Sequence, residues 1–314
     1  MSRPRVTVCM PAYNCAGFLP AAIESVLGQS FGDFELLIAD DCSSDESREI
    51  AARYALLDPR VVLRFREQNL GMVNNWNACF REARGEYVKY LLSDDLLASQ
   101  DALLRMVALL DADPSLALVA SARNIIGADQ DHLAVASAFP DGARLPGTEV
   151  ISRCLLSQKN LIGEPSAVMF RKSHGERGFD GRYSQFVDLE MWFHLLEQGS
   201  FSYIAVPLAS FRIHADQQTK KNVRNLVHVE EMIALLDDYG GKPYLRLGSM
   251  ARRCLVYQQL YRIWKAHKSN LVSRNQALAK VSRYMPAGLF LSLIPLYKLL
   301  NPVWKLVCRM RCRA

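Results

Sequence analysis

The sequence has 314 residues, which is enough for one large domain with an extension or for two domains of ordinary size. Half of the residues are hydrophobic and 22% are charged, a composition that excludes disordered, collagen-like and coiled-coil chains. The net charge of +6 is divided unevenly: residues 1–241 carry 23 basic and 32 acidic side chains, whereas residues 242–314 carry 15 basic side chains and no acidic one. This basic tract predicts a surface for an anionic partner, either a phospholipid membrane or nucleic acid.

Strands and helices are predicted to alternate along the first 120 residues, because short apolar runs are followed by apolar residues at helical spacing. The expected strands are residues 6–10, 34–39, 61–65, 87–92 and 116–120. The expected helices begin near Pro20, after a capping box of Ser43 with Glu46, at Val73 and at Ser99. This alternation is typical of a mostly parallel sheet with right-handed crossovers.

Ligands of such sheets bind beyond the carboxyl ends of the strands. The loops at residues 11–14, 40–45 and 93–95 follow three of the expected strands, so we expect them to share one rim. The next stretch, residues 129–148, is predicted to be a connection without regular structure. Beyond it we expect strands at 166–170, 201–206 and 208–213, a helix at 188–198, and helices from residue 222 onward.

The predicted rim is rich in carboxylates, with Asp40, Asp41 and Asp45 after one strand and Asp94 and Asp95 after another. Adjacent carboxylates repel each other, and a divalent cation such as Mg²⁺ or Mn²⁺ would hold them together. Helix capping is the alternative, and we favour it for Asp45.

Other site types lack support in the sequence. No glycine-rich dinucleotide fingerprint follows the first strand and no P-loop motif occurs. The eight cysteines show neither a CxxC pair nor zinc-site spacing. We therefore expect a protein without a disulfide framework, located in a reducing cytoplasm. We find no signal peptide and expect no membrane-spanning helix.

Several short segments follow one another in a recognisable order. They are residues 6–14 (VTVCMPAYN), 25–30 (SVLGQS), 34–45 (FELLIADDCSSD), 69–71 (NLG) with Asn77, 85–87 (GEY), 93–95 (SDD), 165–166 (PS), 188–192 (DLEMW) and 211–214 (FRIH). In this order and spacing they resemble glycosyltransferase family 2, over residues 5 to about 220.

The resemblance implies a GT-A fold with a Rossmann-like mixed, mostly parallel sheet flanked by helices and extended by a basic helical C-terminal region. It implies a catalytic domain at residues 1–220, with a nucleotide-sugar half at 1–120 and an acceptor half at 121–220, followed by the extension at 221–314. The activity it implies is inverting transfer from a nucleotide-diphosphate sugar, linked to UDP, dTDP or GDP, with Mn²⁺ or Mg²⁺.

The resemblance also implies roles for single residues. Asp188 would be the catalytic base, and Asp94, Asp95 and His214 would hold the metal. Donor-binding residues would be Pro11, Ala12, Tyr13, Asn14, Asp40, Asp41, Asn69, Gly71, Asn77, Ser93 and Asp94. At the start of a helix Asp188 should remain ionised, as a base must. The alternatives are an N-cap role for Asp188 and simple packing for His214.

Three positions depart from the family pattern. Leu92 stands where an Asp-x-Asp motif often begins, Val187 precedes Asp188 where Glu is common, and Cys42 replaces a frequent Gly. The Leu92 departure leaves a degenerate nucleotide-sugar-binding protein as an alternative, against which Asp188 argues. A nucleotidyltransferase is a second alternative because it shares the sheet type, although residues 11–17 offer no glycine-rich phosphate loop with a Lys or Arg.

The basic C-terminal region combines two features of a membrane-interface segment. Apolar residues from Phe290 to Val307 are interspersed with Lys298 and Lys305 and followed by Arg309, Arg311 and Arg313, and prolines 286, 295 and 302 interrupt the helical pattern of the region. A solvated basic face packed on the catalytic domain is the alternative, and nucleic acid is disfavoured because no binding motif is present. We expect a cytoplasmic protein, peripheral on the inner face of the membrane, that extends a surface glycan such as lipopolysaccharide or O-antigen on a glycan or lipid-linked glycan acceptor.

Overall fold

The computed structural model describes residues 3–215, 217–245 and 247–313, with side chains up to Pro302. The chain divides into two compact units. The first contains residues 1–150, 161–183 and 187–215, and the second contains residues 151–160, 184–186 and 216–314. Three segments of the expected 1–220 domain, residues 151–160, 184–186 and 216–220, therefore belong to the second unit. The tail side chains from Val303 onward, which the membrane prediction includes, lie outside the described residues.

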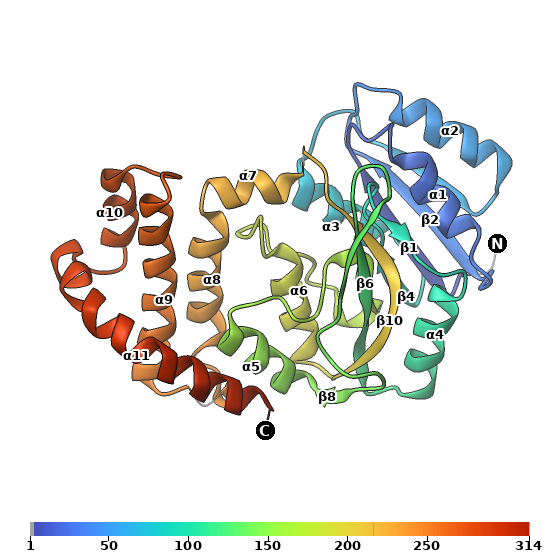
Figure 1. Ribbon diagram of the computed structural model, residues 1–314. Helices are drawn as coiled ribbons and strands as arrows, with labels where there is room; N and C mark the ends of the chain where they lie inside the picture. Colours follow the sequence, from blue (N-terminus) through green and yellow to red (C-terminus); the bar gives the residue numbers. More distant parts are fainter. Residues whose placement is uncertain (1–2, 216, 246, 314) are drawn as a thin grey trace. The chain divides into compact units, whose positions relative to one another are not determined.

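The first unit is built on one mixed sheet (Figure 1). Its strands run in the order β3-β2-β1-β4-β9-β6-β10-β5, with β7 beside β6 and β8 beside β10. Strands β1 to β4 are parallel, β10 is parallel to β6, and β9, β5, β7 and β8 are antiparallel to their neighbours. The strand bounds are β1 Val6–Ala12, β2 Phe34–Asp40, β3 Val61–Phe65, β4 Tyr87–Tyr90, β5 Leu96–Leu97, β6 Leu116–Ile126, β7 His132–Ala136, β8 Arg144–Pro146, β9 Val168–Arg171 and β10 Ser200–Arg212.

Helices cover both faces of this sheet, because successive residues of a strand point to opposite sides. Val6, Val8 and Met10 pack in the core with α1 (Leu19–Leu27), α2 (Ser47–Leu57) and α4 (Ala102–Ala112), while Cys9 contacts the Cys79 carbonyl of α3 (Met72–Glu82). Helix α6 (Val187–Leu196) packs on the same face as α3 through aromatic contacts of Trp192, and Figure 1 shows both helices on that side. Helix α5 (Gly147–Ser157) crosses the division between the units.

The predicted capping box of Ser43 and Glu46 is wrong. Helix α2 begins at Ser47, and its N-cap Glu46 makes no side-chain cap bond. The Ser43 hydroxyl instead accepts a hydrogen bond from the Asn14 backbone N–H at 2.9 Å. A contact between two loops thus replaces the local cap.

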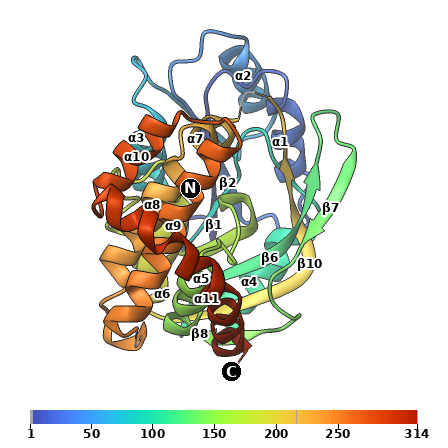
Figure 2. The same cartoon turned by 60° about the vertical axis from the view of Figure 1, so that its left-hand side comes forward.

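The prediction of an irregular connection at residues 129–148 is also wrong, because β7 and β8 form there. Strand β6 is longer than predicted and continues to Ile126, where β7 pairs with it (Figure 2). The two strands expected at 201–206 and 208–213 form the single strand β10, whose pairing with β6 shifts around Pro207. Proline lacks a backbone N–H, so it disturbs the ladder without ending the strand.

The second unit is helical, as predicted for this part of the chain. Its helices are α7 Gln218–Arg224, α8 Val227–Tyr239, α9 Ser249–Lys268, α10 Arg274–Ser282 and α11 Ala287–Arg313. Tyr257, Ile263 and Trp264 of α9 pack with Phe290 of α11 in a core of its own. Among the described helices, none has the length and apolarity needed to cross a bilayer.

Candidate active site

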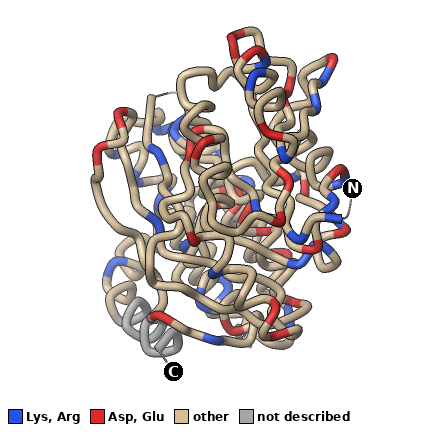
Figure 3. The backbone as a smooth tube through the Cα atoms, turned by 90° about the vertical axis from the view of Figure 1, so that its right-hand side faces the viewer, with Lys and Arg blue, Asp and Glu red and all other residues tan. Residues whose placement is uncertain are grey.

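The loops that follow β1 and β2 are joined at the carboxyl edge of the sheet. Asn14 donates its backbone N–H to Ser43, and its side-chain oxygen accepts the backbone N–H of Ser44 at 2.9 Å. The Asp41 backbone N–H donates to the Ala12 carbonyl at 2.9 Å. Asn14 has φ of +47°, so this contact holds a backbone conformation that side chains disfavour. Acidic and basic residues are interspersed along the trace near the N-terminus in Figure 3.

Asp94 and His214 meet although 120 residues separate them in the sequence. The distance from His214 Nε2 to Asp94 Oδ2 is 3.0 Å, and both side chains are partly buried. The Phe18 ring, from the loop after β1, lies against the His214 imidazole with ring centroids 4.9 Å apart. The end of β10, the turn after β4 and the loop after β1 therefore converge.

Asp95 points into the protein and fastens this turn. Its carboxylate accepts hydrogen bonds from Ser166 Oγ at 2.5 Å and from the Arg212 backbone N–H at 2.9 Å. Burial, and then the charge of Asp94, raise the pKa of Asp95 well above its ordinary value. The Arg212 guanidinium donates to the Asp94 carbonyl at 2.7 Å, so side chain and backbone both tie the turn to β10.

Lys89 lies behind the turn in β4 and is fully buried. Its ammonium donates to the carbonyls of Tyr90 at 2.9 Å, Pro165 at 3.4 Å and Ser166. Burial lowers the pKa of Lys89 to about 7. Lys89 thereby holds the same segment whose Ser166 hydroxyl contacts Asp95.

Asp188 is the second residue of α6, inside the helix rather than at its N-cap. Burial raises the pKa of Asp188 to about 7, and the charge of Glu164 adds to this, although the Leu189 backbone N–H donates to the carboxylate at 2.7 Å. This pKa differs from what the helix start alone predicts for Asp188, because the loss of hydration outweighs the helix terminus.

The segment at residues 163–166 contacts both α6 and the turn after β4. Trp192 of α6 donates its indole N–H to the Gly163 carbonyl at 3.0 Å. The charge of Glu164 raises the pKa of both Asp188 and Asp95, so the two carboxyl groups share one electrostatic neighbour. Asp188 and the turn after β4 thus belong to one connected region of the first unit.

Asp41, which follows β2, binds the segment that leads into α3. Its two carboxylate oxygens accept the backbone N–H groups of Leu70 at 2.7 Å and Gly71 at 2.9 Å. Gly71 has φ of +79°, a conformation suited to glycine, and precedes α3. Asn69 supports the turn by donating to the Asp41 carbonyl at 3.0 Å.

Asp40 has one carboxylate oxygen that lacks a protein partner. Oδ1 accepts from Arg48 Nε at 2.6 Å and from the Ser43 backbone at 3.1 Å. Oδ2 is buried and has no hydrogen-bond partner in the described part of the chain. A buried acceptor without a partner costs free energy, which a ligand donor can recover.

The remaining predicted donor-binding residues lie in different environments. Pro11 and Ala12 continue β1 and are buried, while the Tyr13 side chain is 54% exposed. Ser93, which precedes Asp94 in the sequence, is buried. Asn77 is bound elsewhere: its amide makes two hydrogen bonds with the Phe179 backbone, at 2.9 and 2.7 Å.

Of the three predicted metal ligands, Asp94 and His214 lie together, as a pair rather than as part of a larger cluster. No group of three or more His, Cys, Asp and Glu side chains that could hold a metal occurs among the described residues. His214 Nε2 and Asp94 Oδ2 contact each other directly at 3.0 Å, as a hydrogen bond or ion pair. Two ligands about 2.1 Å from an octahedral cation at a right angle lie at about the same separation. The pair suits a site completed by phosphate oxygens and water.

Comparison with known proteins decides the family. The model described as Glycosyl transferase family 2 matches residues 7–178, which is more than half of the chain. The chain belongs to glycosyl transferase family 2. An uncharacterized Mycobacterium tuberculosis protein is 29% identical over 70% of this glycosyltransferase and 70% of its own length.

Two further relatives are named for an activity. The chondroitin synthase of Pasteurella multocida is 27% identical over 70% of this chain, and the putative teichuronic acid biosynthesis glycosyltransferase TuaG of Bacillus subtilis is 38% identical over 30%. The matched parts cover only 22% and 37% of those two proteins.

Solved structures confirm the predicted GT-A fold class. TarS 1-349 of S. aureus in complex with UDP-GlcNAc matches with a TM-score of 0.67 and 15% identity, over 97% of this chain and 89% of that one. Mannosyltransferase PcManGT from Pyrobaculum calidifontis, in complex with GDP-Man and Mn²⁺, matches with a TM-score of 0.60 and 19% identity, over 99% and 86%.

The sequence of this glycosyltransferase predicts no role for Arg212, Ser166, Lys89 or Phe18. Arg212 and Ser166 belong to two of the segments that resemble glycosyltransferase family 2. An arginine and a serine at these positions do not by themselves indicate contacts with Asp95. Lys89 offered the clearest signal, because a lone lysine interrupts the otherwise apolar strand Tyr87–Tyr90. A buried lysine needs acceptors, and here backbone carbonyls supply them.

Proposed function

We propose that this glycosyltransferase moves a sugar from a nucleotide-diphosphate donor to a hydroxyl group of a growing surface glycan, with inversion of the anomeric centre. The observation that carries the proposal is the link between the Asp94 turn and Asp188 through residues 163–166, since one group would serve the donor and the other the acceptor. Residues 1–120 would hold the donor and residues 121–220 the acceptor.

Asp40 and Tyr13 would bind the nucleotide base. The unpartnered Asp40 Oδ2 suits a base that donates an N–H, as the ring N–H of uracil, thymine or guanine does. The exposed Tyr13 ring offers a stacking surface. UDP, dTDP and GDP sugars are therefore the proposed donors, in line with the UDP-GlcNAc and GDP-Man of the two solved structures.

Asp94 and His214 would hold Mn²⁺ or Mg²⁺ together with the donor diphosphate. Their 3.0 Å separation and their mixed oxygen and nitrogen atoms fit that ion. When bound, the ion neutralises the negative charge of the leaving diphosphate. Asp95 was predicted as a third metal ligand. Its hydrogen bonds to Ser166 and Arg212 instead support a role in positioning Asp94.

Asp188 would take the proton from the acceptor hydroxyl. Its pKa of about 7 makes the ionised form available at neutral pH while keeping the carboxylate basic enough to accept a proton. Attack of that hydroxyl from the side opposite the leaving group inverts the anomeric centre. The buried setting of Asp188 also excludes competing water.

The acceptor would be a surface polysaccharide, such as lipopolysaccharide or O-antigen, or its lipid-linked precursor. The similarity to a chondroitin synthase and to the putative teichuronic acid biosynthesis glycosyltransferase TuaG supports the polymer class. The basic second unit would associate with the anionic inner face of the membrane, where a lipid-linked glycan is made.

Calorimetry with UDP, dTDP and GDP, each with and without Mn²⁺, tests the donor half of the proposal. We expect one nucleotide to bind with an affinity that Mn²⁺ increases. Nucleotide release from the matching sugar donors then tests catalysis, and Asp188→Asn should retain donor binding but lose release by several orders of magnitude. Arg182→Gln, an exposed change in the same unit, is the control. The release assay includes a polysaccharide acceptor. Nucleotide binding by the parent protein without release in the presence of acceptor would reject a transferase, and no nucleotide binding would reject any nucleotide-sugar role.

A further inference from the structure

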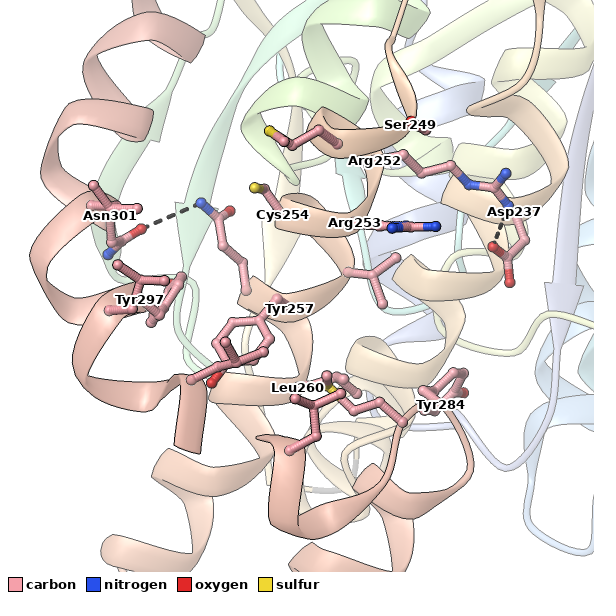
Figure 4. Close-up of a pocket in the computed structure, with 18 residues that line it drawn as sticks. Asp237, Ser249, Arg252, Arg253, Cys254, Tyr257, Leu260, Tyr284, Tyr297 and Asn301 are labelled. Carbon is pink, nitrogen blue, oxygen red and sulfur yellow. Dashed lines mark hydrogen bonds and ion pairs between the residues drawn. The ribbon is translucent and has the colours of Figure 1, made fainter. Parts of the chain in front are cut away.

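A groove of about 770 Å³ lies within the second unit (Figure 4). It is formed by α9, the first part of α11, the segment before α11 and the end of α8. All of its lining residues fall within the second unit. The volume lies in the range of about 300–1,000 Å³ that is usual for small-molecule sites.

The walls of the groove are apolar and exposed. Met250 is 78% exposed, Leu289 is 50% exposed, and Leu296 and Leu300 are each 52% exposed. An apolar ligand that covers these side chains would gain a favourable binding free energy, in proportion to the apolar area removed from water. Exposed apolar side chains that gather around one groove mark a binding surface.

One side of the groove is polar and basic. Arg252, Arg253 and Asp237 lie together there in Figure 4. Asp237, the one acidic residue among those that line the described groove, pairs with Arg252 at 2.6 Å. The exposed Arg253 leaves this side with a net positive charge. The ligand should therefore be amphipathic, with an anionic group joined to an apolar chain.

We propose that this groove binds a hydrocarbon chain of an anionic phospholipid, with the lipid phosphate beside Arg253. The inference rests on the membrane association proposed above and adds a ligand and a place for it. A second copy of the chain fits less well, because it would bring the same tract of 15 basic side chains and no acidic one against itself.

The chain part of the proposal is tested with phosphatidylglycerol that carries a pyrene-labelled acyl chain, supplied below the concentration at which it aggregates. We expect the full-length protein to bind it and Leu296→Ser to bind about tenfold more weakly. Leu299→Ser is the matched control, since Leu299 lies on the same helix and is 74% exposed but does not line the groove. Equal affinity of both variants, or no binding by the parent, overturns the proposal.

The headgroup part uses Arg253→Gln with Arg274→Gln, an exposed arginine of α10, as its control. Arg253→Gln should weaken binding of the labelled phosphatidylglycerol but leave binding of a pyrene-labelled diacylglycerol unchanged. Glycerol 3-phosphate should not compete, because it has the phosphate without the chain. Competition by glycerol 3-phosphate at the lipid's own concentration would assign the site to free phosphates and overturn the proposal.

Size-exclusion chromatography of the same variants tests the other occupant. A dimer that dissociates in Leu296→Ser, with lipid binding unchanged, would assign the groove to a second copy. The lipid assay contains no sugar donor, so it is independent of catalysis. Failure of lipid binding in a preparation that binds nucleotide rejects this inference alone.

Discussion

Burial gives Asp188 the property that a general base requires. A carboxylate of ordinary pKa is ionised at neutral pH but accepts a proton poorly, whereas one with a pKa near 7 accepts it well and is still ionised in about half of the molecules at pH 7. The sequence placed Asp188 at a helix start but could not show that desolvation dominates. That knowledge needs the surrounding side chains, which come from distant parts of the chain.

This pKa predicts the pH dependence of the reaction. We expect kcat/KM for the donor to rise about tenfold per pH unit below pH 7 and to level off above it, because only the ionised carboxylate removes the proton. The measurement is a pH profile of nucleotide release at saturating acceptor. The residual rate of Asp188→Asn should lack this rise; if the variant keeps the same rise, another group titrates.

Cys42 adopts a strained backbone conformation. It stands where the family often has Gly, and its φ is +64°, in the left-handed region. A side chain in that region costs about 1–2 kcal/mol. The loop therefore tolerates Cys42 rather than requiring it.

Cys42→Gly should raise the free energy of unfolding by about 1 kcal/mol, since relief of strain exceeds the added entropy of the unfolded chain. Urea unfolding measures the change. Cys42→Ala removes the thiol but keeps the strained conformation, so it should show no gain. An equal gain in both variants would mean that the thiol, and not the backbone, is the source.

Among the elements, those with strong local patterns were predicted well. Strand β3 has the predicted bounds, and α1 and α3 begin within one residue of the expected starts. The misses lie where distant segments decide the structure: Ser43 binds Asn14 rather than its own helix, and β7 forms because β6 extends to pair with it. The candidate site divides in the same way, since its carboxylates were visible in the sequence but the contacts of Asp95 were not.

Arg212 shows how one side chain joins three elements. Its guanidinium, at the end of β10, donates to the carbonyls of Asp94 after β4 and of Gly127 and Ala128 after β6, at 2.7, 3.3 and 2.8 Å. The planar group with its several donors can reach both segments at once, which a lysine cannot do. The position of Asp94 depends on this brace.

Arg212→Lys should therefore weaken Mn²⁺-dependent nucleotide binding by about tenfold, since the Asp94 turn loses its support. Arg171→Lys is the control, because Arg171 also donates to three backbone carbonyls, those of Leu116, Leu110 and Asp113, away from the turn. Unfolding curves should show similar destabilisation of both variants. If calorimetry finds the same loss of nucleotide affinity in both variants, the effect of Arg212 on nucleotide binding comes from its contribution to overall stability and not from its contact with the Asp94 turn.

At the scale of the whole molecule, charge separates along the chain rather than within one domain. Residues 1–241 have a net charge of −9 and residues 242–314 of +15, by subtraction of the acidic from the basic side chains. An anionic surface would therefore attract the second unit and repel much of the first. Each basic residue near anionic lipid contributes about 1 kcal/mol.

Neutralising two exposed lysines of α9 should therefore weaken binding to vesicles by about 30-fold, the equivalent of about 2 kcal/mol. Lys265→Gln/Lys268→Gln makes that change, and Arg53→Gln/Arg81→Gln removes the same charge from exposed positions on α2 and α3. Sedimentation with vesicles containing 30% phosphatidylglycerol measures both, and added salt should reduce the difference because it screens exposed charges. If the second unit contacts the membrane, only Lys265→Gln/Lys268→Gln should sediment less. If its basic residues are merely solvated, the two double variants should sediment alike. Because none of these four positions lines the groove of α9 and α11, the result stands whether or not a lipid chain enters it.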